Sequence, residues 1–291
     1  MNHEYGDYGS AGRAFARVAN VLRARMTDGS YPLNSMLPAQ RDLAHELGVS
    51  RDTVQRVLKE LAAEGWIVQR LGSGSRVVRT QEIRSPASSY RPDHTVTLGT
   101  LISRAFDQPE VVLDVFTLSC ESLDAHIRLQ AERIRIGVIA PERIALRILL
   151  PDASLDFPYW RTGAADHDQL LKERFVTIMR RHTASLRSVL ADLKAMKLVP
   201  SVDFKVRQVM LVPAFKLYLV NGLEALQGPY KVFKRPIALD DGEEIEAIDV
   251  FGLGAGLTHH AKDADPYSTE TVFVNEWQDW FDSAWEFLAV T

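Results

Sequence analysis

The first eighty residues carry apolar side chains at helical spacing, separated by polar turn signals. Between Ala11 and Thr27 apolar positions recur every three to four residues, which predicts an amphipathic helix. A second helix is expected from Ala39 to Leu47, with Pro38 in its first turn and Gly48 as the left-handed residue that ends it. The positions expected to be buried in these two helices are Phe15, Val18, Val21, Leu22, Met26, Leu43, Ala44 and Leu47.

A third helix is expected to start after Ser50, whose hydroxyl suits the N-cap position. Its inward-facing residues are Val54, Val57, Leu58 and Leu61. Two short apolar segments, 66–68 and 76–78, flank the glycine- and serine-rich residues 71–75, which predicts a β-hairpin. Two helices joined by a short turn and followed by a hairpin predict a winged helix-turn-helix, whose third helix has the size to enter the DNA major groove.

A resemblance to the N-terminal domain of the GntR family of bacterial transcription regulators is carried by the segment LPAQRDLAHELGVSRDTVQRVLKELAAEGWIVQRLGSGSRVV. The resemblance combines the motifs LPxxRxLA, VSRxTV at the start of the third helix, EGW after that helix and GxG in the wing. It implies that this domain binds operator DNA. The residues that it implies as DNA contacts are Arg41, Ser50, Arg51 and Thr53, with Ser73 and Gly74 of the wing near the minor groove.

One position departs from the family pattern. Gln55 stands where the family usually has arginine, and Arg56 follows it. Because Gln pairs naturally with adenine and Arg with guanine, both are candidate base contacts, and the operator is expected to differ from the common family half-site. The structural alternative is an i,i+4 surface ion pair between Asp52 and Arg56, and Lys59 is expected to be a solvated face residue. A winged helix can also serve only for protein interaction, which the arginine pattern disfavours.

Charge divides the chain of 291 residues into two unlike parts. The formal net charge is −4, but residues 1–80 carry 11 Lys and Arg against 8 Asp and Glu, a net of +3, and the rest carries −7. A basic head on an acidic body fits a phosphate-binding module joined to a domain with another role. We therefore expect a DNA-binding domain over 1–80, a polar linker with two prolines over 81–95, and a ligand-sensing and dimerisation domain over 96–291.

Strand and helix periods alternate in the C-terminal part, which predicts an α/β domain with parallel pairing between strands that flank a helix. The fold class is therefore α/β in a multi-domain chain. So many strands disfavour the all-helical, metal-binding effector domain of the GntR family, and the chorismate-lyase-like type is shorter and largely antiparallel. Strands are expected at 111–118, 144–150, 206–212, 217–220, 230–233 and 245–250, and helices at 123–139, 168–198 and 274–289.

A second resemblance, to the phospholipase-D motif H-x-K-x4-D-x6-G-S, lies in the spacing of the run AFKLYLVNGLEALQGPY. The motif positions read Ala214, Lys216, Asn221, Gly228 and Pro229. Because alanine has no nucleophilic atom, covalent phosphoryl transfer by this motif cannot proceed. The resemblance therefore implies a catalytically inactive, phospholipase-D-like sensor domain, with Lys216 and Asn221 as candidate ligand contacts. The alternative is that Lys216 is an ordinary edge-strand lysine.

Other candidate features have structural alternatives. A metal site could form from His259, His260, Asp263 and Asp265, but their glycine and alanine neighbours favour a mobile loop. The run FGLGAG at 251–256 lacks the following helix that a phosphate cradle needs and is expected to be a turn. Cys120 follows a strand with no base nearby in sequence, so a buried apolar cysteine is expected.

The last predicted helix carries a stripe of apolar, mostly aromatic residues at helical spacing: Trp277, Trp280, Phe281, Trp285 and Leu288. Packing in the core is the expected role of such a stripe. A dimer interface or the wall of a ligand pocket is the alternative.

The expected function is that of a DNA-binding transcription regulator, a ligand-responsive repressor that binds a palindromic operator as a homodimer. Neither catalytic residues nor a metal or cofactor are expected; the alternative is an enzyme, phosphodiesterase-like or other, that the winged helix only localises. A single cysteine supports no disulfide framework, and no apolar run reaches the roughly 18 residues that span a bilayer. With no secretory signal at the N-terminus, a cytoplasmic protein without a membrane partner is expected.

Overall fold

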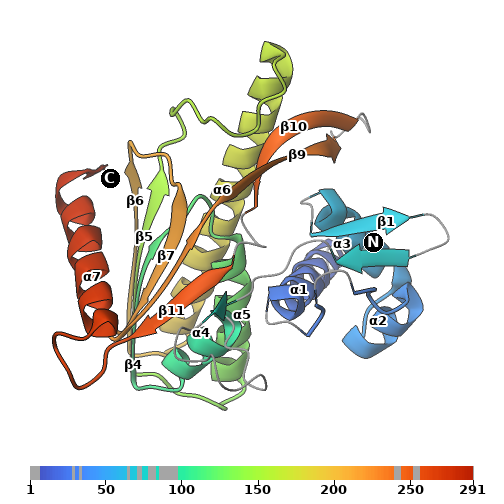
Figure 1. Ribbon diagram of the computed structural model, residues 1–291. Helices are drawn as coiled ribbons and strands as arrows, with labels where there is room; N and C mark the ends of the chain where they lie inside the picture. Colours follow the sequence, from blue (N-terminus) through green and yellow to red (C-terminus); the bar gives the residue numbers. More distant parts are fainter. Residues whose placement is uncertain are drawn as a thin grey trace.

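The computed structural model describes residues 7–27, 30–32, 35–63, 66–70, 74–77, 83–84, 98–238, 244–251 and 256–290. They form an N-terminal winged-helix domain and a larger C-terminal α/β domain (Figure 1), which confirms the predicted fold class. The Gly65 end of the third helix, the wing tip with Ser73, and most of the predicted linker lie outside the described residues.

The N-terminal domain has the predicted order of elements. Helix α2 begins one residue after Ala39, because the backbone of Ala39 is extended with ψ at 148°, so Pro38 precedes the helix and does not lie in its first turn. Gly48 ends α2 in the left-handed conformation with φ at 62°, as predicted. The elements are α1 (Asp7–Thr27), α2 (Gln40–Leu47), α3 (Arg51–Ala63), β1 (Ile67–Arg70) and β2 (Gly74–Val77).

One hydrophobic core joins these elements. The inward faces predicted for α2 and α3 are buried, together with Trp66 at the start of the hairpin and Val77 at its end. Strands β1 and β2 pair antiparallel, with Ile67 opposite Val77 and Arg70 opposite Gly74. The hairpin is therefore fixed to the helices through its apolar side chains.

The C-terminal domain is built on an eight-stranded mixed sheet with the order β12-β6-β5-β4-β7-β8-β11-β3. The predicted parallel pairing is present, because β4 pairs parallel with β5 and β5 parallel with β6. The strands are β3 (Ile83–Arg84), β4 (Glu110–Phe116), β5 (Arg143–Pro151), β6 (Ser201–Val209), β7 (Phe215–Val220), β8 (Glu224–Pro229), β11 (Leu257–Ala261) and β12 (Ala289–Val290).

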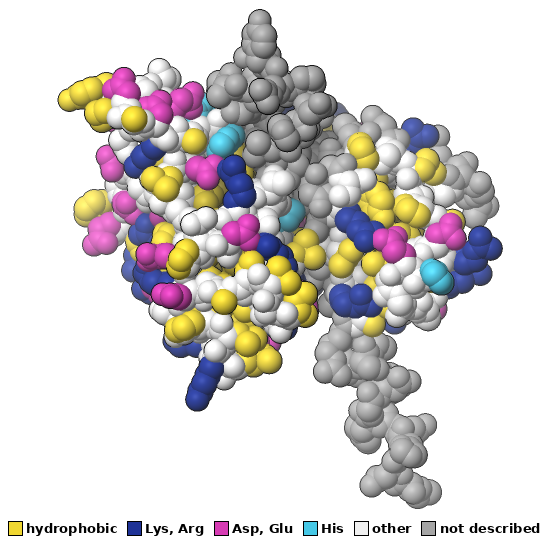
Figure 2. All heavy atoms as spheres, turned by 90° about the horizontal axis from the view of Figure 1, so that it is seen from below, with side chains coloured by type: hydrophobic (Ala, Val, Ile, Leu, Met, Phe, Trp, Pro, Cys, Tyr) yellow, Lys and Arg dark blue, Asp and Glu magenta, His cyan; other side chains and the backbone are white. Residues whose placement is uncertain are grey.

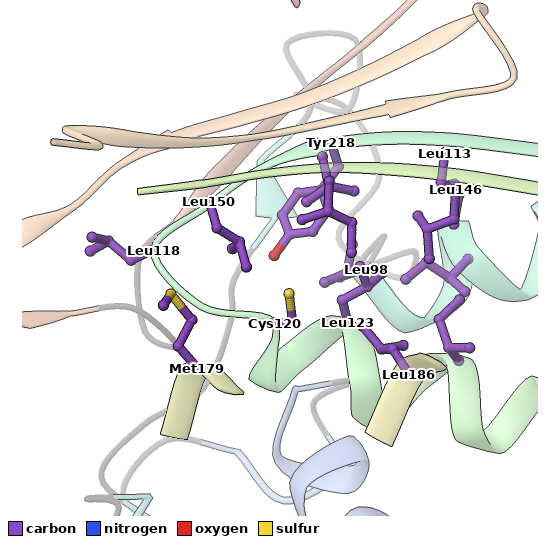
Figure 3. Close-up of a cluster of buried hydrophobic side chains, with 14 of the residues drawn as sticks. Leu98, Leu113, Leu118, Cys120, Leu123, Leu146, Leu150, Met179, Leu186 and Tyr218 are labelled. Atoms are coloured by element: carbon purple, nitrogen blue, oxygen red, sulfur yellow. The ribbon is translucent and has the colours of Figure 1, made fainter. Parts of the chain in front are cut away.

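Helices cover both faces of this sheet (Figure 1). The larger core lies between the sheet and the helices α4 (Leu98–Phe106), α5 (Glu121–Arg135) and α6 (Ala165–Ala195), where leucines pack around Cys120 and Tyr218 (Figure 3). Helix α7 (Thr269–Phe287) covers the opposite face with Phe281 and Trp285, so the aromatic stripe does pack in the core. Leu288, at its end, is about half exposed.

Three parts of this domain differ from the predicted elements. Helix α4 and the strands β8 and β11 were not predicted. The two strands are short and show no clear period, whereas the apolar residues of α4 do recur at helical spacing, over little more than two turns: Leu98, Leu101, Ile102, Ala105 and Phe106. The strands β9 (Lys231–Ala238) and β10 (Glu244–Phe251) form a separate antiparallel hairpin outside the main sheet. Within the predicted linker, β3 pairs parallel with β11 at the edge of the sheet.

Gly228 lies on β8 where the neighbouring strand approaches too closely for a side chain. A Cβ atom at this position would lie 2.3 Å from the carbonyl oxygen of Gly256 and 2.8 Å from Cδ2 of Leu257. We expect Gly228→Ala to destabilise the C-terminal domain by about 1–3 kcal/mol, since a backbone atom must move to relieve the overlap. Urea unfolding followed by circular dichroism measures this change.

Gly137→Ala is the matched control for that substitution. Gly137 has a positive φ of 74° but nothing within 4 Å of a built Cβ, so only backbone strain of about 1–2 kcal/mol is expected there. Destabilisation by Gly228→Ala of less than about 1 kcal/mol would contradict the close approach of β8 and β11.

Within the described part of the chain, no helix combines the length and apolar character that crossing a membrane requires.

Candidate DNA-binding surface and C-terminal pocket

The first turn of α3 is fixed by its N-cap. The backbone N–H of Thr53 donates a hydrogen bond to Oγ of Ser50 at 3.1 Å, and the two hydroxyl oxygens lie 2.9 Å apart. Val54 and Val57 are buried on the inner side, which leaves Arg51 and Gln55 exposed on the outer side. The cap therefore holds in place the turn that carries three of the predicted DNA contacts, Ser50, Arg51 and Thr53.

The two other predicted parts of the DNA-binding surface lie on α2 and in the wing. The side chain of Arg41 is 83% exposed and contacts only the neighbouring Asp42 at 3.4 Å among the described ion pairs. Gly74, the first residue of β2, has φ at 83°, and a Cβ there would lie 3.1 Å from the terminal carbon of Met36. Figure 2 shows Lys and Arg side chains at the surface of the N-terminal lobe, on the right of the view.

Arg56 has a structural contact as well as an exposed position. Its guanidinium carbon lies 5.3 Å from the centroid of the Phe15 ring, a cation–π distance that connects α3 to α1. Gln55, one residue earlier, has no such partner among the described contacts and is exposed. Of the two candidate base contacts, Arg56 packs against another side chain of the domain, whereas no described contact within the domain involves the side chain of Gln55.

We expect Ser50→Ala to lower the free energy of unfolding of the winged-helix domain by about 0.5–2 kcal/mol, because the N–H of Thr53 loses its acceptor. Ser50→Asp is the matched control, since aspartate also accepts this hydrogen bond and favours the positive end of the helix dipole. Thermal unfolding of both variants measures the difference. A loss of the same size in the aspartate variant would show that capping does not explain the effect.

Glu60 of α3 connects the two domains. Its Oε1 lies 3.2 Å from Nη2 of the buried Arg23 in α1 and 3.2 Å from Nη1 of Arg181 in α6. Helix α1 also packs against α5 of the C-terminal domain. The third helix is thus linked by a shared carboxylate to the longest helix of the other domain.

A pocket with a cavity volume of about 90 Å³, partly open to solvent, lies in the C-terminal domain. Its walls come from the segment 117–122 at the end of β4 and the start of α5, from Trp160, and from α6, β7 and the β9–β10 hairpin. Its position after the carboxyl end of β4, where the sheet changes from parallel to antiparallel pairing, is where α/β sheets commonly bind ligands. Its charged wall residues are Glu121, Arg174, Lys216, Arg235 and Asp249.

Lys216 and Asn221, the two candidate ligand contacts, lie at opposite ends of β7. Lys216 lines the pocket, is 3% exposed and has its Nζ 5.7 Å from the centroid of the Tyr230 ring. Because β7 pairs with both β4 and β8, Lys216 is not an edge-strand lysine. Asn221 has φ at 52° in the following turn, and its Oδ1 accepts a hydrogen bond from the N–H of Val112 at 2.7 Å, away from the described pocket wall.

Tyr230 fixes the segment between β4 and α5. Its hydroxyl oxygen accepts a hydrogen bond from the N–H of Leu118 at 2.8 Å and lies 3.0 Å from the hydroxyl of Thr117. Burial raises the pKa of the Tyr230 phenol. Thr117, Leu118 and Tyr230 all line the pocket, so this network shapes one of its walls.

A buried polar cluster joins α5 to α6 and has no counterpart among the sequence predictions. Oδ2 of Asp124 lies 2.9 Å from Nδ1 of His182, and Oδ1 accepts a hydrogen bond from Ser185 at 2.5 Å. The guanidinium of Arg128 donates to both Ser185 and Asp124. Asp124 and Arg128 lie on α5, and His182 and Ser185 lie on α6, up to 61 positions away in the sequence. A periodic pattern within one helix therefore could not indicate this cluster.

The remaining sequence candidates have other roles in the fold. His259 and His260 lie on strand β11 and not in a mobile loop; their ring nitrogens contact Glu224 at 2.6 Å and Glu270 at 2.7 Å. Among the described residues no group of three or more His, Cys, Asp and Glu side chains could hold a metal ion. Cys120 is fully buried, as predicted, and burial raises the pKa of its thiol to about 12. Of the run 251–256, only Phe251 and Gly256 are described.

Comparison with known proteins gives one family match, over residues 15–77, to the bacterial regulatory proteins of the gntR family. A histidine utilization repressor of Pseudomonas putida is 38% identical over 63 residues, covering 22% of this chain and 25% of that protein. The fatty acid metabolism regulator protein of Vibrio cholerae is 38% identical over 122 residues, covering 38% of this chain and 40% of that protein.

An uncharacterized HTH-type transcriptional regulator of Bacillus subtilis, YdfD, is 30% identical over 119 residues, which are 39% of this chain and 25% of that protein. The chain thus spans between a quarter and two fifths of the length of these curated relatives. Among solved structures, the archaeal chromatin protein TrmBL2 aligns over 94% of this chain and 92% of its own, with 12% identity. The TM-score of this alignment is 0.28.

Proposed function

We propose that this chain, whose residues 15–77 form a GntR-family helix-turn-helix domain, is a transcription repressor that binds operator DNA as a homodimer and responds to a small molecule. The observation that carries the proposal is the outer face of α3. A capped first turn presents Arg51 and Gln55 to solvent, while the inner face anchors the helix in the core. A helix held in this way can enter the major groove without rearrangement.

The predicted contacts divide among four proposed roles. Arg41, Ser50 and Thr53 contact phosphates, and Ser73 and Gly74 bring the wing near the minor groove. Arg51 and Gln55 reach base edges, with Gln55 favouring adenine. Arg56 contributes mainly by orienting α3, since its guanidinium lies against Phe15 of α1.

A two-fold dimer accounts for a palindromic operator. Two copies related by a two-fold axis present their α3 helices to half-sites about one helical turn, roughly 34–36 Å, apart. The net positive charge of residues 1–80 and the net negative charge of the rest support DNA contact through the N-terminal domain, because positive charge attracts phosphates. We place the repressor in the cytoplasm, where its operator DNA is accessible.

Ligand response is supported by the path from the pocket to α3. Arg174 and Ile178 of α6 line the pocket, and Arg181, one turn further along the same helix, contacts Glu60 of α3. A ligand that binds more tightly when α6 is displaced would shift the population away from the DNA-binding arrangement. By thermodynamic linkage, DNA binding would change the affinity of the pocket for the ligand by the same factor as the ligand changes the affinity for DNA.

The alternative is an enzyme that the winged helix only localises. Neither of the two positions considered as a nucleophile, 214 and 120, provides a reactive one. Ala214 occupies the histidine position of the phospholipase-D spacing and has no reactive atom. Cys120 is buried and its pKa is raised to about 12, which disfavours the thiolate. Turnover of bis(p-nitrophenyl) phosphate by the full chain, above that of a heat-denatured sample, would favour the enzyme instead.

The test of the proposed function is selection from a pool of randomised DNA duplexes with the full chain. We expect enrichment of an inverted repeat and a complex that holds two chains per duplex, measured by sedimentation. A scrambled version of the enriched duplex is the control, and it should bind with the salt-sensitive affinity of non-specific DNA. Failure to enrich any sequence would overturn sequence-specific binding, and a single chain per duplex would overturn the homodimer.

A further inference from the structure

One edge of the large sheet is open along strand β6. On its inner side β6 pairs with β5 over its whole length, whereas on its outer side β12 pairs only with Gln208 and Val209. Among the described residues no strand pairs with the outer side of residues 201–207. Pro200, which has no N–H to donate, precedes this segment, so the open edge is bounded at both ends and centred on Phe204.

The backbone groups that face this open edge belong to alternate residues. The N–H of Ser201 donates to the carbonyl of Glu142 at 3.0 Å. The carbonyl of Val209 accepts from the N–H of Asp152 at 2.9 Å, so the odd-numbered residues bond on the β5 side. Because successive residues of a strand direct their backbone groups to opposite sides, the even-numbered residues present theirs to the open side, where a further strand can pair with them. These residues are Val202, Phe204 and Val206.

The side chains of the open segment are also of two kinds. The three even-numbered ones are half-buried against the core on the α6 side, where the guanidinium carbon of Arg187 lies 5.1 Å from the centroid of the Phe204 ring. The odd-numbered ones lie on the α7 side, since Arg207 donates to the carbonyl of Trp285. Among them Asp203 and Lys205 are 50% and 59% exposed, and within one chain they pair only with each other among the described ion pairs.

Two copies of this edge can pair antiparallel about a two-fold axis through Phe204. In that register each Asp203 lies directly opposite the Lys205 of the other copy, and Phe204 lies opposite its own counterpart. Opposite charges and aromatic pairs at directly opposite positions stabilise a sheet. A register shifted by two residues would place two Asp203 or two Lys205 side chains opposite each other, and like charges there are destabilising. Charge thus selects the same centre that β12 and Pro200 define.

The same pairing places both winged helices on one side of the joined sheet. A two-fold axis that relates antiparallel neighbours is perpendicular to the sheet, so each face stays on its own side. The winged helix lies on the side of α5 and α6, opposite α7 (Figure 1). Helix α6 connects β5 to β6, next to the open edge, and its Arg181 contacts Glu60 of α3. The two α3 helices therefore come to the same side of the dimer, close to its axis, as a palindromic operator requires.

Apolar side chains are exposed at both ends of the open segment. Val290 of β12, beside Gln208, is 55% exposed, and Met196, in the turn before β6, is 59% exposed. An antiparallel two-fold brings the β12 end of one copy next to the Met196 end of the other. A second copy would therefore cover apolar surface at both ends as well as the backbone groups between them.

We infer that the open edge of β6 is the dimerisation surface of this chain, and that its occupant is the β6 edge of a second copy, paired antiparallel about Phe204. One sheet then runs through both C-terminal domains. The inference rests on the proposed function for the existence of a homodimer, and it adds where the two copies meet. Exposed charges on an edge strand can also prevent pairing, so the test must distinguish attraction from protection.

The experiment reverses the two charges one at a time in the full chain and measures particle mass by sedimentation velocity over a series of concentrations. We expect the wild type to dimerise. Asp203→Lys and Lys205→Asp each place like charges opposite each other, so each should raise the dissociation constant of the dimer about tenfold or more. An equimolar mixture of the two variants should dimerise like the wild type, because opposite charges then meet between unlike copies. The double variant Asp203→Lys/Lys205→Asp should dimerise with itself for the same reason.

Glu110→Lys is the matched control, because Glu110 is a 61% exposed strand residue that pairs with Arg143 within the chain, on β4 and not at the open edge. Its reversal should leave the dimer unchanged. Near-ultraviolet circular dichroism checks that each variant is folded, and dimerisation of the mixture shows the same for the two single variants.

Wild-type dimer affinity in both single variants would overturn the inference, and so would single variants that dissociate but do not dimerise when mixed. A wild type that is monomeric alone and on the selected duplex rejects both the inference and the proposed homodimer. Loss and recovery of the dimer without enrichment of any DNA sequence rejects the proposed DNA binding alone. Sequence-specific binding by dimers that the reversals leave intact rejects this inference alone.

Discussion

Arg51→Ala is expected to weaken binding to the selected operator by about 1–3 kcal/mol, which is roughly five- to 150-fold in affinity. Arg51 is exposed on the first turn of α3, next to the cap that orients this turn, and no ion pair among the described residues engages it. Its loss should therefore remove contacts to DNA without removing contacts within the domain. A mobility-shift titration at fixed salt concentration measures the change.

Two controls separate this effect from general loss of charge. Arg143 is an exposed arginine at the start of β5 and pairs with Glu110 of β4, so both residues belong to the C-terminal domain. Arg143→Ala should leave operator affinity unchanged. Discrimination between the operator and its scrambled version should also fall in Arg51→Ala, if this arginine reads bases. An equal loss on both duplexes would restrict Arg51 to phosphate contact.

Trp66→Ala is expected to lower the free energy of unfolding of the winged-helix domain by about 3–5 kcal/mol, the range for deleting a large buried aromatic side chain. Trp66 is fully buried where α3 ends and the hairpin begins, and its backbone N–H donates to the carbonyl of Leu61 at 2.8 Å. A domain of this size has only about 5–15 kcal/mol of stability, so much of it would be lost. Urea unfolding followed by far-ultraviolet circular dichroism measures the shift.

The C-terminal domain serves as the internal reference for that variant. Its unfolding transition should stay at the same urea concentration, because its cores are formed by other residues. Trp66→Phe, which retains an aromatic ring, should lose less stability than the alanine variant. Operator binding should fall with the folded fraction of the winged helix, and full affinity in Trp66→Ala would contradict the role of this core in orienting α3.

The winged helix could be predicted closely because its signals are local. The cap at Ser50, the left-handed Gly48 and the buried face of α3 each depend on residues within a few positions of one another. The start of α2 was predicted one residue too early, since Pro38 suits both the first turn and the position before it. Family resemblance added the candidate DNA contacts, which local patterns alone would not assign.

Lys216 is the one residue of the pocket wall that the sequence analysis named as a ligand contact. That prediction came from the resemblance to the phospholipase-D motif and not from a hydrophobic or polar pattern. Trp160, Arg174, Arg235 and Asp249 come from a loop, a helix and two strands, and no spacing in the chain relates them. The conformation of Trp160 has no sequence signal either, because its positive φ is maintained by contacts with β10. Asn221 was predicted as a ligand contact, whereas its amide is used by the backbone of Val112.

The sequence by itself therefore determined the winged helix, its capped third helix and the α/β character of the remainder, because hydrophobic period and capping act over one or two turns of chain. Only the tertiary structure decided which strands are neighbours, that Glu60 joins α3 to Arg181 of α6, and that five separate segments enclose a pocket with charged and apolar walls. Those features depend on contacts between residues far apart in the chain, whose free energies exist only once the sheet and its helices have packed.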